Sequence, residues 1–480
     1  MLRRVLAWML LVPSSASAAF AQERPNVVFI LADDLGINDL GCYGRAEHRT
    51  PNLDRLAAQG ARFTSAYAAC SVCSPTRAAI LTGKSPARLH LTTFLPGRAD
   101  APSQRVLHPT IRQQLPLEEV TLAEHLKAAG YATACVGKWH LGGQGFGPEK
   151  QGFDEVHAGK ANTNPVNFEG EGGKGEIDLA KAAESFLERN RDRPFFLYLC
   201  HNNPHIPLAA RQRPVAANKG AFNPTYAAMI EMLDESVGRV LKKLDDLDLA
   251  DKTLVIFTSD NGGLHVPELN DDSPTHNSPY RAGKGFLYEG GLRVPLIVRW
   301  PGMIDAGRKI DDPVISTDWT PTLLNACQIA IRQGYDGISL VNLFRGGTLA
   351  PRPLFWHVPH YTNQGGRPAG AIRIQQWKVI EPYDGDPPEF YDLEKDPGES
   401  HDLAMARPEH LGLLIDRLKR WRLDIRAQAN TPNPDFDEAK FQAIYKVVDV
   451  SKLRPYRTAA ETSGLIRGWR ELIDAAVRKP

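Results

Sequence analysis

Four segments of the chain combine a short apolar run with a neighbouring amphipathic stretch. The apolar runs cover residues 27–31, 131–136, 195–200 and 253–258. They are continuous rather than alternating and contain many β-branched and aromatic residues, which is typical of parallel strands buried on both faces. With polar residues after each run, this repetition predicts an α/β fold in which helices sandwich a large, mostly parallel sheet.

After about residue 350 the pattern changes. Short stretches of strand-like composition begin near residues 353, 370 and 389, Asp384-Gly385 is a turn signal, and an amphipathic stretch covers 410–425. We therefore predict a large domain over residues 22–350 and a smaller α+β domain over residues 351–480, built on a short antiparallel sheet. The last 45 or so residues are polar and give no clear signal.

The first 21 residues differ from the rest of the chain. Arg3 and Arg4 precede an apolar run over residues 5–12, and small residues follow up to Gln22. This pattern predicts a signal peptide over residues 1–21, so we expect a periplasmic or secreted protein. The run is too short to span a bilayer, no later segment is apolar enough, and we expect no membrane span.

The composition of the chain does not favour nucleic acid as a partner or disulfides as the basis of the fold. The 480 residues carry a formal net charge of +1, so no bulk charge favours nucleic acid as a partner. Six cysteines in a chain of this length do not make a disulfide scaffold. Any anion must therefore bind at a local site.

Several chemically distinctive side chains directly follow the predicted strands. The carboxyl ends of parallel strands meet at one edge of a sheet, so residues distant in sequence come together there. The residues concerned are Asp33, Asp34, Lys138, His140, His205, Asp260 and Asn261. This convergence predicts a polar site at that edge.

Cys70 and Cys73 form a C-x-x-C pair whose role is open on spacing alone. Half a zinc site, a redox pair, two structural cysteines and a nucleophile are the alternatives. Among the six cysteines no second C-x-x-C completes a zinc site. Pro75 and Arg77, at what we expect to be a helix N-terminus, do not favour the redox pair.

The residues from Cys73 onward, C-S-P-T-R-A-A-I-L-T-G, resemble the active-site signature of the sulfatase family, C-x-P-x-R followed by Leu-Thr-Gly. Further similar motifs occur in the family's order across residues 25–400: ADDLG, GKWHLG, NPHIP, SDNGG and GKGFLYEGGLRVP. The resemblance implies an alkaline-phosphatase-like fold and hydrolysis of sulfate monoesters to an alcohol and inorganic sulfate.

For Cys73, the resemblance implies oxidation to Cα-formylglycine by a formylglycine-generating enzyme. The hydrated aldehyde attacks sulfur through one hydroxyl, and loss of a proton from the second hydroxyl expels sulfate. The resemblance also implies a calcium ion, with magnesium as the alternative, held by Asp33, Asp34, residue 73, Asp260 and Asn261. Oxygen ligands of this kind suit a hard divalent cation.

The basic residues receive distinct roles by the same resemblance. Arg77 holds the hydrated aldehyde and neutralises the metal carboxylates, while Lys138 and Lys284 bind sulfate oxygens. His140 is the expected base that releases sulfate, and His205 the expected acid that protonates the leaving alcohol.

The substrate is the least defined part. The loop after residue 356 gathers His357, His360, Asn363 and Arg367, and such donors and acceptors suit a sugar. We therefore expect a sulfated carbohydrate. The alternatives are an arylsulfatase acting on small aryl sulfates, a phosphodiesterase or phosphonate hydrolase of the same superfamily, and a non-catalytic calcium-dependent glycan-binding protein.

Overall fold

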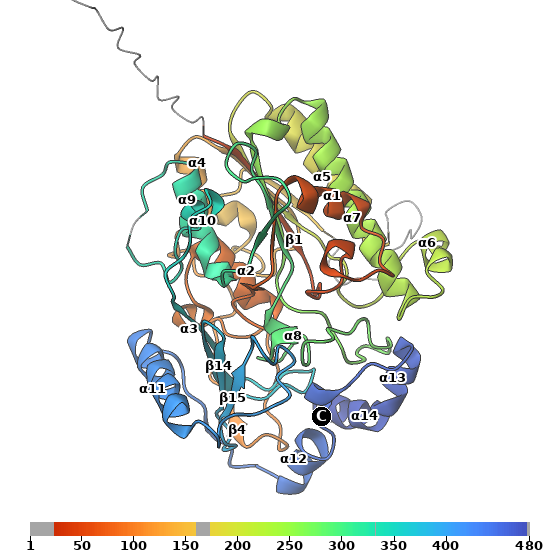
Figure 1. Ribbon diagram of the computed structural model, residues 1–480, viewed down its shortest axis with the longest axis vertical. Coiled ribbons are helices and arrows are strands. Elements are labelled where there is room, and N and C mark those ends of the chain that lie inside the picture. The colour runs from red at the N-terminus through yellow and green to blue at the C-terminus, as the bar shows by residue number, and fades with distance from the viewer. Residues whose placement is uncertain (1–23, 160–172, 332, 478–480) are drawn as a thin grey trace, which may run out of the picture.

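The computed structural model describes residues 24–159, 173–331 and 333–477, so the predicted signal peptide over 1–21 lies outside the described residues. An eight-stranded sheet forms the centre of the molecule (Figure 1). In spatial order its strands are β10 (Arg308–Ile310), β2 (Ala61–Phe63), β9 (Leu296–Arg299), β8 (Thr253–Ser259), β1 (Asn26–Ala32), β7 (Phe195–Cys200), β5 (Ala132–Gly137) and β6 (Glu155–Ala158).

Most neighbours in this sheet are parallel, as the sequence predicts. β1 pairs in parallel with β7 on one side and β8 on the other, and β5 pairs in parallel with β7 and β6. β9 runs antiparallel to both β8 and β2. The four predicted strands are confirmed to within about one residue at each end.

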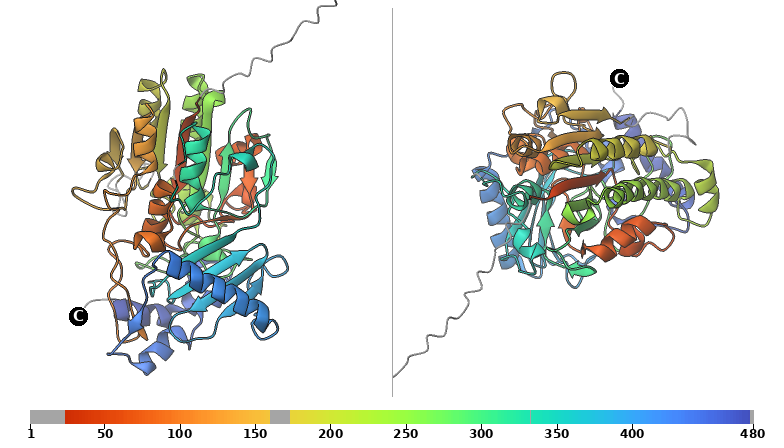
Figure 2. Two further views of the ribbon diagram at one scale, coloured as in Figure 1. Left: turned by 90° about the vertical axis from the view of Figure 1, so that its left-hand side faces the viewer. Right: turned by 90° about the horizontal axis from the view of Figure 1, so that it is seen from above.

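Both faces of the sheet are covered, which explains why its strands are continuously apolar. Along β1, Val27 and Phe29 belong to one apolar cluster, whereas Val28 and Ile30 belong to another. Figure 2 shows helices on the two sides of the sheet. The first cluster takes in α2 (Cys73–Thr82), α4 (Leu122–Ala128), α9 (Trp319–Ala326) and α10 (Val341–Phe344); the second takes in α1 (Pro51–Gln59), α5 (Glu176–Arg189) and α7 (Pro224–Asp246).

A second, antiparallel sheet lies at one end of the central sheet (Figure 1). Its strands in order are β12 (Pro353–Val358), β13 (Ala369–Ile374), β14 (Trp377–Pro382) and β15 (Glu389–Asp392). Helix α11 (Pro408–Asp424) covers one face through Leu414 and Leu418. The other face packs on the central domain, where Trp356 contacts Tyr67 and its indole N–H donates to the Ala68 carbonyl at 2.8 Å. These two sheets confirm the predicted fold class, whereas the boundary at residues 350 and 351 stays a prediction.

A buried group of charges, which we call the interface cluster, joins the two sheets. Lys378 of β14 lies between Glu289 and Glu399, with Nζ–O distances of 2.9 and 2.8 Å. Glu289 also accepts from the Tyr67 hydroxyl at 2.6 Å, and Glu399 accepts from the Glu289 backbone N–H at 2.7 Å. All three charged side chains are buried, and each glutamate is paired with Lys378.

The C-terminal residues form helices that the sequence analysis did not predict. They are α12 (Glu438–Tyr445), α13 (Ala459–Leu465) and α14 (Arg467–Val477). Phe441, Trp469 and Ile473 pack there against Leu264 and Phe286 of the loop after β8. Helices α12 and α13 have only 8 and 7 residues, which leaves little room for a periodic signal. In α14, Trp469, Ile473 and Ala476 do recur at helical spacing, a signal that our prediction overlooked.

The remaining elements are short. They are β3 (Ala66–Tyr67) paired with β11 (Val314–Ile315), β4 (Val106–Leu107) paired with β16 (Thr431–Pro432), and the helices α3 (Pro86–Leu89), α6 (Gln212–Ala217) and α8 (Glu289–Leu292). Among the described residues, no helix has the length and apolar character needed to cross a membrane.

Candidate active site

The predicted polar site forms at the carboxyl ends of the neighbouring strands β1 and β8. Ala32 pairs with Ser259 at the end of this ladder, so Asp33 and Asp260 follow side by side. The Asp34 backbone N–H donates to Asp260 Oδ1 at 3.2 Å, and Asn261 Nδ2 donates to Asp34 Oδ1 at 2.7 Å. The four predicted metal ligands on these strands are thus brought together in the buried interior.

Cys73 is the first residue of α2, and Arg77 lies one turn further along the same helix. Arg77 is fully buried, and its Nε and a terminal nitrogen lie 2.9 and 2.7 Å from Asp260 Oδ2. Its other terminal nitrogen donates to the Lys138 carbonyl at 2.9 Å. The guanidinium therefore ties the helix of the cysteine to the strand-end carboxylates, as a fork-shaped donor can.

A glycine at the end of β5 brings Lys138 into the site. Gly137 has φ +103°, and a Cβ there would lie 1.8 Å from the Cys200 carbonyl oxygen of β7. Only glycine permits this approach. Lys138 then points Nζ at Asp33 Oδ2, 2.5 Å away, and its side chain is 5% exposed.

His140 faces Cys73 directly. Its Nδ1 lies 3.3 Å from Cys73 Sγ, while its Nε2 lies 2.9 Å from the Leu95 carbonyl oxygen. A carbonyl only accepts, so Nε2 carries the hydrogen and Nδ1 of the neutral ring is an acceptor. Burial, assisted by the nearby Lys138 ammonium, lowers the pKa of His140 to about 3. The ring is therefore neutral near pH 7, as a base must be.

Lys284 and His205 lie on the other side of the carboxylates. Lys284 Nζ is 2.7 Å from Asp34 Oδ2 and 3.0 Å from His205 Nε2. His205 Nδ1 faces the Ile206 carbonyl, so Nε2 accepts from the lysine. Burial outweighs the attraction of Asp34 and lowers the pKa of His205 to about 3.

The donor set fits a hard divalent cation. One ligand atom each of Asp33, Cys73 and Asp260 lies within 4.8 Å of the others. Asp33 Oδ1 and Asn261 Oδ1 are buried oxygens without a hydrogen-bond partner in the described part of the chain. Burial, and then the charge of Asp33, raise the pKa of Asp260 to about 6, a strain that a bound cation would relieve. Oxygens of this kind are calcium and magnesium ligands.

The structure separates the predicted substrate residues into two groups. The side chains of His357 and Arg367 are engaged by the C-terminal domain itself: His357 lies 2.8 Å from both the Tyr383 hydroxyl and the Gln428 carbonyl, and Arg367 pairs with Asp384 and Asp386. Their polar atoms are bonded within the C-terminal domain, and a role for either residue in substrate binding stays a prediction.

The same loop nevertheless reaches the site through its tip. Thr362 Oγ1 lies 3.3 Å from the Gly285 carbonyl, next to Lys284, and Gln364 Nε2 donates to Glu268 at 2.7 Å. His360 is buried, with Nε2 2.8 Å from Thr92 Oγ1. Asn363 is half-buried, and its Oδ1 has no hydrogen-bond partner among the described residues.

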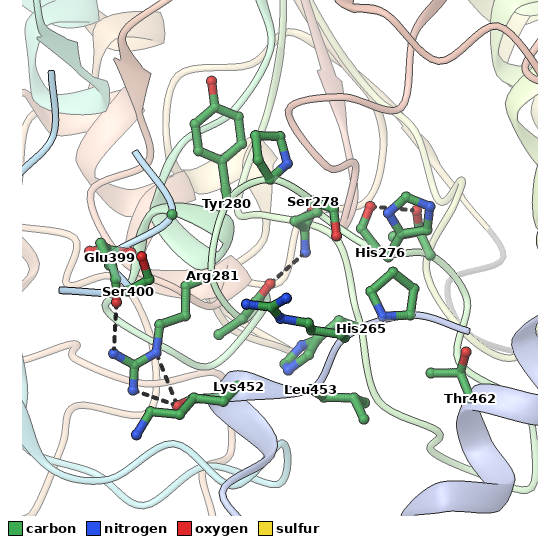
Figure 3. Close-up of a pocket in the computed structure, with 18 residues that line it drawn as sticks. His265, His276, Ser278, Tyr280, Arg281, Glu399, Ser400, Lys452, Leu453 and Thr462 are labelled. Atoms are coloured by element: carbon green, nitrogen blue, oxygen red, sulfur yellow. Dashed lines mark hydrogen bonds between the residues drawn. The ribbon is translucent and has the colours of Figure 1, made fainter. Parts of the chain in front are cut away.

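A separate cavity of about 620 Å³ is lined in part by residues 275–282, which precede Lys284 in the chain (Figure 3). His276 and Arg281 line it from one side, and Lys452 and Leu453 from the other. None of the strand-end residues is among its lining residues. Asn277, also in its wall, donates to the Gly263 and Ala282 carbonyls at 2.9 Å and thereby supports this segment.

Two buried residues near His205 escaped the sequence analysis. Lys174 and Glu176 precede and begin α5, and both hydrogen-bond the loop that follows β7. They lie in the stretch GGKGEID, which has no apolar run and no strand end to single it out. Only the fold places them against this loop.

Buried carboxylate and amide oxygens beside a cysteine, flanked by lysines and histidines, suit the hydrolysis of anionic esters. The sulfatase family model matches residues 25–329, and the model described as N-sulphoglucosamine sulphohydrolase, C-terminal, matches residues 282–424. The chain belongs to the sulfatase family and is a sulfuric ester hydrolase, as the sequence motifs predict.

Individual relatives agree with this assignment. Human arylsulfatase A is 35% identical over 471 residues, covering 84% of this chain and 89% of the relative. The N-acetylgalactosamine-6-sulfatase of Canis lupus familiaris is 36% identical over 388 residues, covering 73% and 72%. The crystal structure of Ps i-CgsB in complex with k-i-k-neocarrahexaose superimposes with a TM-score of 0.73 at 29% identity, covering 84% of this chain and 93% of that one.

Proposed function

We propose that the chain hydrolyses sulfate monoesters of a carbohydrate, with residue 73 acting in its Cα-formylglycine form. The observation that carries the proposal is the convergence of Asp33, Asp34, Asp260 and Asn261 beside Cys73, with cations and imidazoles around them. A formylglycine-generating enzyme is the partner that maturation requires. Export to the periplasm or beyond, through residues 1–21, belongs to the same proposal.

Asp33, Asp34, Asp260 and Asn261, together with residue 73, would hold the calcium or magnesium ion. When bound, the cation would polarise the sulfate ester, and a hydroxyl of the hydrated aldehyde would be the nucleophile in place of the thiol. Arg77 keeps Asp260 oriented, since its Nε donates to Oδ2 of that carboxylate and a terminal nitrogen lies 2.7 Å from the same oxygen.

His140 is placed to take a proton from residue 73. Its Nδ1 faces the side chain of that residue at 3.3 Å, and the Leu95 carbonyl fixes the ring by accepting from Nε2. His140 also has φ +58°, a backbone conformation that a histidine holds only when its surroundings support it. Positioned bases of this kind contribute about 10²- to 10⁴-fold to a rate.

Lys138 and Lys284 supply the positive charge that the sulfate group meets. Both ammonium groups are buried, where a charge acts more strongly than in water. Lys284 also donates to His205 Nε2, the ring nitrogen that does not face a backbone carbonyl and that would have to carry the proton for the leaving oxygen. Protonation of His205 requires added negative charge nearby, which a bound sulfate ester brings.

A saccharide is favoured over a small aryl group by what surrounds Lys284. Gln364 lies against Gly285, and its Oε1, like Asn363 Oδ1 in the same loop, is a buried oxygen without a hydrogen-bond partner in the described part of the chain, which suits sugar hydroxyls. Two similar proteins support the same choice: an N-acetylgalactosamine-6-sulfatase, and Ps i-CgsB, whose structure is in complex with k-i-k-neocarrahexaose.

Two measurements test the proposal. The first is mass spectrometry of the peptide containing residue 73, together with labelling by a hydrazide probe, because an aldehyde reacts and a thiol does not. The second compares sulfate release from sulfated monosaccharides and from 4-nitrophenyl sulfate. Faster turnover of the saccharides is expected; equal turnover would remove the saccharide assignment, and no sulfate release from converted protein would overturn the function.

A further inference from the structure

The loop from His201 to Ile206, which carries His205, is held by two buried residues that do not reach the sulfate site themselves. The loop follows β7 and passes directly beneath Asp33, whose backbone N–H donates to the Asn203 carbonyl at 3.1 Å. A shift of this loop would therefore move His205 relative to Asp34 and Lys284. The residues that hold this loop therefore determine the position of His205, the proposed acid.

Glu176 secures the start of the loop. Its Oε1 accepts from the backbone N–H groups of Asn202 and Asn203 at 3.2 and 3.0 Å. Its Oε2 is hydrogen-bonded to His201 Nδ1. Glu176 is fully buried at the first turn of α5, so a packed helix fixes this carboxylate.

Lys174 secures the end of the loop. Its Nζ donates to the His205 carbonyl at 2.7 Å and to the Ile206 carbonyl at 3.1 Å. The side chain is 1% exposed, and burial lowers the pKa of Lys174 to about 8 despite the opposing attraction of Asp33. Burying an ammonium group costs free energy, even when two backbone carbonyls accept hydrogen bonds from it. That cost favours a specific role for Lys174 in holding the loop.

We propose that Lys174 is a positioning residue for leaving-group protonation: it clamps the backbone of His205, with Glu176 as its counterpart at the other end of the loop. This inference rests on the proposed function, in which His205 serves the departing alcohol. Lys174 acts through the backbone of His205 and does not touch the substrate.

The test compares two aryl esters of similar size that differ in how much their departing oxygen needs a proton. Phenolate needs one, whereas 4-nitrophenolate departs without one far more readily. In Lys174→Met, kcat for phenyl sulfate is expected to fall about 10- to 100-fold and kcat for 4-nitrophenyl sulfate less than about threefold, because only the acid is displaced. Lys174→Arg, which keeps the cation and its donors, is expected to lie closer to the wild type on phenyl sulfate.

Lys181→Met is the matched control, since Lys181 is an exposed residue of α5 nearby, and it is expected to leave both rates unchanged. Equal losses on the two esters, or no loss on phenyl sulfate, would overturn the inference while leaving the proposed function intact. If Lys174→Met does not fold, Lys174→Gln, which retains one donor, is measured in its place and judged by the same split.

A second readout does not depend on turnover. In the Lys174 variant, amide hydrogen exchange is expected to accelerate at residues 202–206 and to stay unchanged in β7 itself. Wild-type protein that carries the aldehyde yet releases no sulfate from any ester would refute the proposed function. The exchange pattern would then still decide whether Lys174 clamps the loop, with unchanged exchange at 202–206 counting against it.

Discussion

Two of the buried clusters of charged side chains in the described part of the chain are organised in opposite ways. We call the polar residues that follow β1 and β8, together with the cations that pair with them, the strand-end cluster; its members are Asp33, Asp34, Asp260, Asn261, Arg77, Lys138 and Lys284. The interface cluster of Lys378, Glu289 and Glu399 lies between the two sheets. Both have desolvated charges, so burial alone does not distinguish a functional site from a structural one.

What distinguishes them is how their oxygens are used. In the interface cluster, both carboxylates pair with Lys378, and hydroxyl and backbone donors add to them. Glu399 Oε1 makes no hydrogen bond of good geometry among the described residues, but it lies 2.8 Å from the Lys378 ammonium. In the strand-end cluster, Asp33 Oδ1 and Asn261 Oδ1 have no hydrogen-bond partner in the described parts of the chain, and the site adjoins a cysteine and two imidazoles. Unpaired buried oxygens are costly, which favours a ligand as their partner.

The largest expected effect is at residue 73. Cys73→Ala removes the proposed nucleophile, and sulfate release is expected to fall about 10⁴-fold or more, as when other covalent catalysts lose theirs. The melting temperature should stay close to that of the wild type, because the side chain is small. Cys42→Ala, at a half-buried cysteine away from the signature, is the control. Retained turnover in Cys73→Ala would separate the strand-end cluster from catalysis.

Removing the interface cation tests the structural half of the comparison. Lys378→Met leaves Glu289 and Glu399 buried without their counter-charge, and the free energy of unfolding is expected to fall by about 3–5 kcal/mol. Turnover per folded molecule should change little. Urea denaturation followed by fluorescence measures the loss; a variant as stable as the wild type would show that the interface cluster does not hold the sheets together.

The corresponding change in the strand-end cluster should reduce activity strongly and stability only a little. Lys284→Met is expected to lower kcat about 10²- to 10³-fold, since it removes a buried donor for developing negative charge. Its effect on the unfolding free energy should be smaller than that of Lys378→Met. Steady-state kinetics measure the fall in kcat, and urea denaturation measures the change in unfolding free energy. A variant that loses stability but keeps its kcat would contradict the proposed role of Lys284.

Calcium should stabilise the protein through the strand-end oxygens. A ligand that binds only the folded state at a hundred times its Kd adds about 2.7 kcal/mol of stability. We therefore expect added calcium to raise the melting temperature of the wild type and to leave that of Asp33→Asn almost unchanged. Asp192→Asn, at an exposed position, should respond like the wild type. An equal calcium response in Asp33→Asn would place the ion elsewhere.

The smallest expected effect is a pH dependence of the interface cluster. Burial, and the charge of Glu289, raise the pKa of Glu399 to about 7 against the attraction of Lys378. The folded state then holds a proton that the unfolded chain releases above its ordinary pKa of 4.5. Stability from this group is full below pH 4.5 and is lost as the pH rises toward 7.

In Glu399→Gln the side chain is an uncharged amide at every pH, so it resembles the protonated form of Glu399. Between pH 5 and 8 the variant should gain stability relative to the wild type, on the order of 2 kcal/mol. Urea denaturation of both proteins across this range measures the difference. A difference that is constant with pH would show that Glu399 is ionised throughout.

The sequence predicted the strand-end cluster well because its geometry follows from topology. Asp33 and Asp260 come directly after apolar runs, and parallel neighbours place such residues side by side whatever the rest of the chain does. The central strands were predictable for the same reason, since burial on both faces makes them continuously apolar.

The C-terminal region shows why other parts could not be predicted. Arg367 pairs with Asp384 and Asp386, and nothing local in the sequence reveals that pairing. Lys174 acts on carbonyls about thirty residues away, and those backbone groups have no sequence signature. Contacts that depend on loop packing are invisible to periodicity.

The packing of Trp356 has a consequence for how this protein can be divided. Its ring covers Tyr67 and its indole bonds Ala68, so the antiparallel sheet supplies one wall of the core beside the cysteine helix. A fragment ending at residue 350 would expose that wall to water and should aggregate rather than fold. The smaller sheet is thus a structural half of the enzyme and not a detachable accessory.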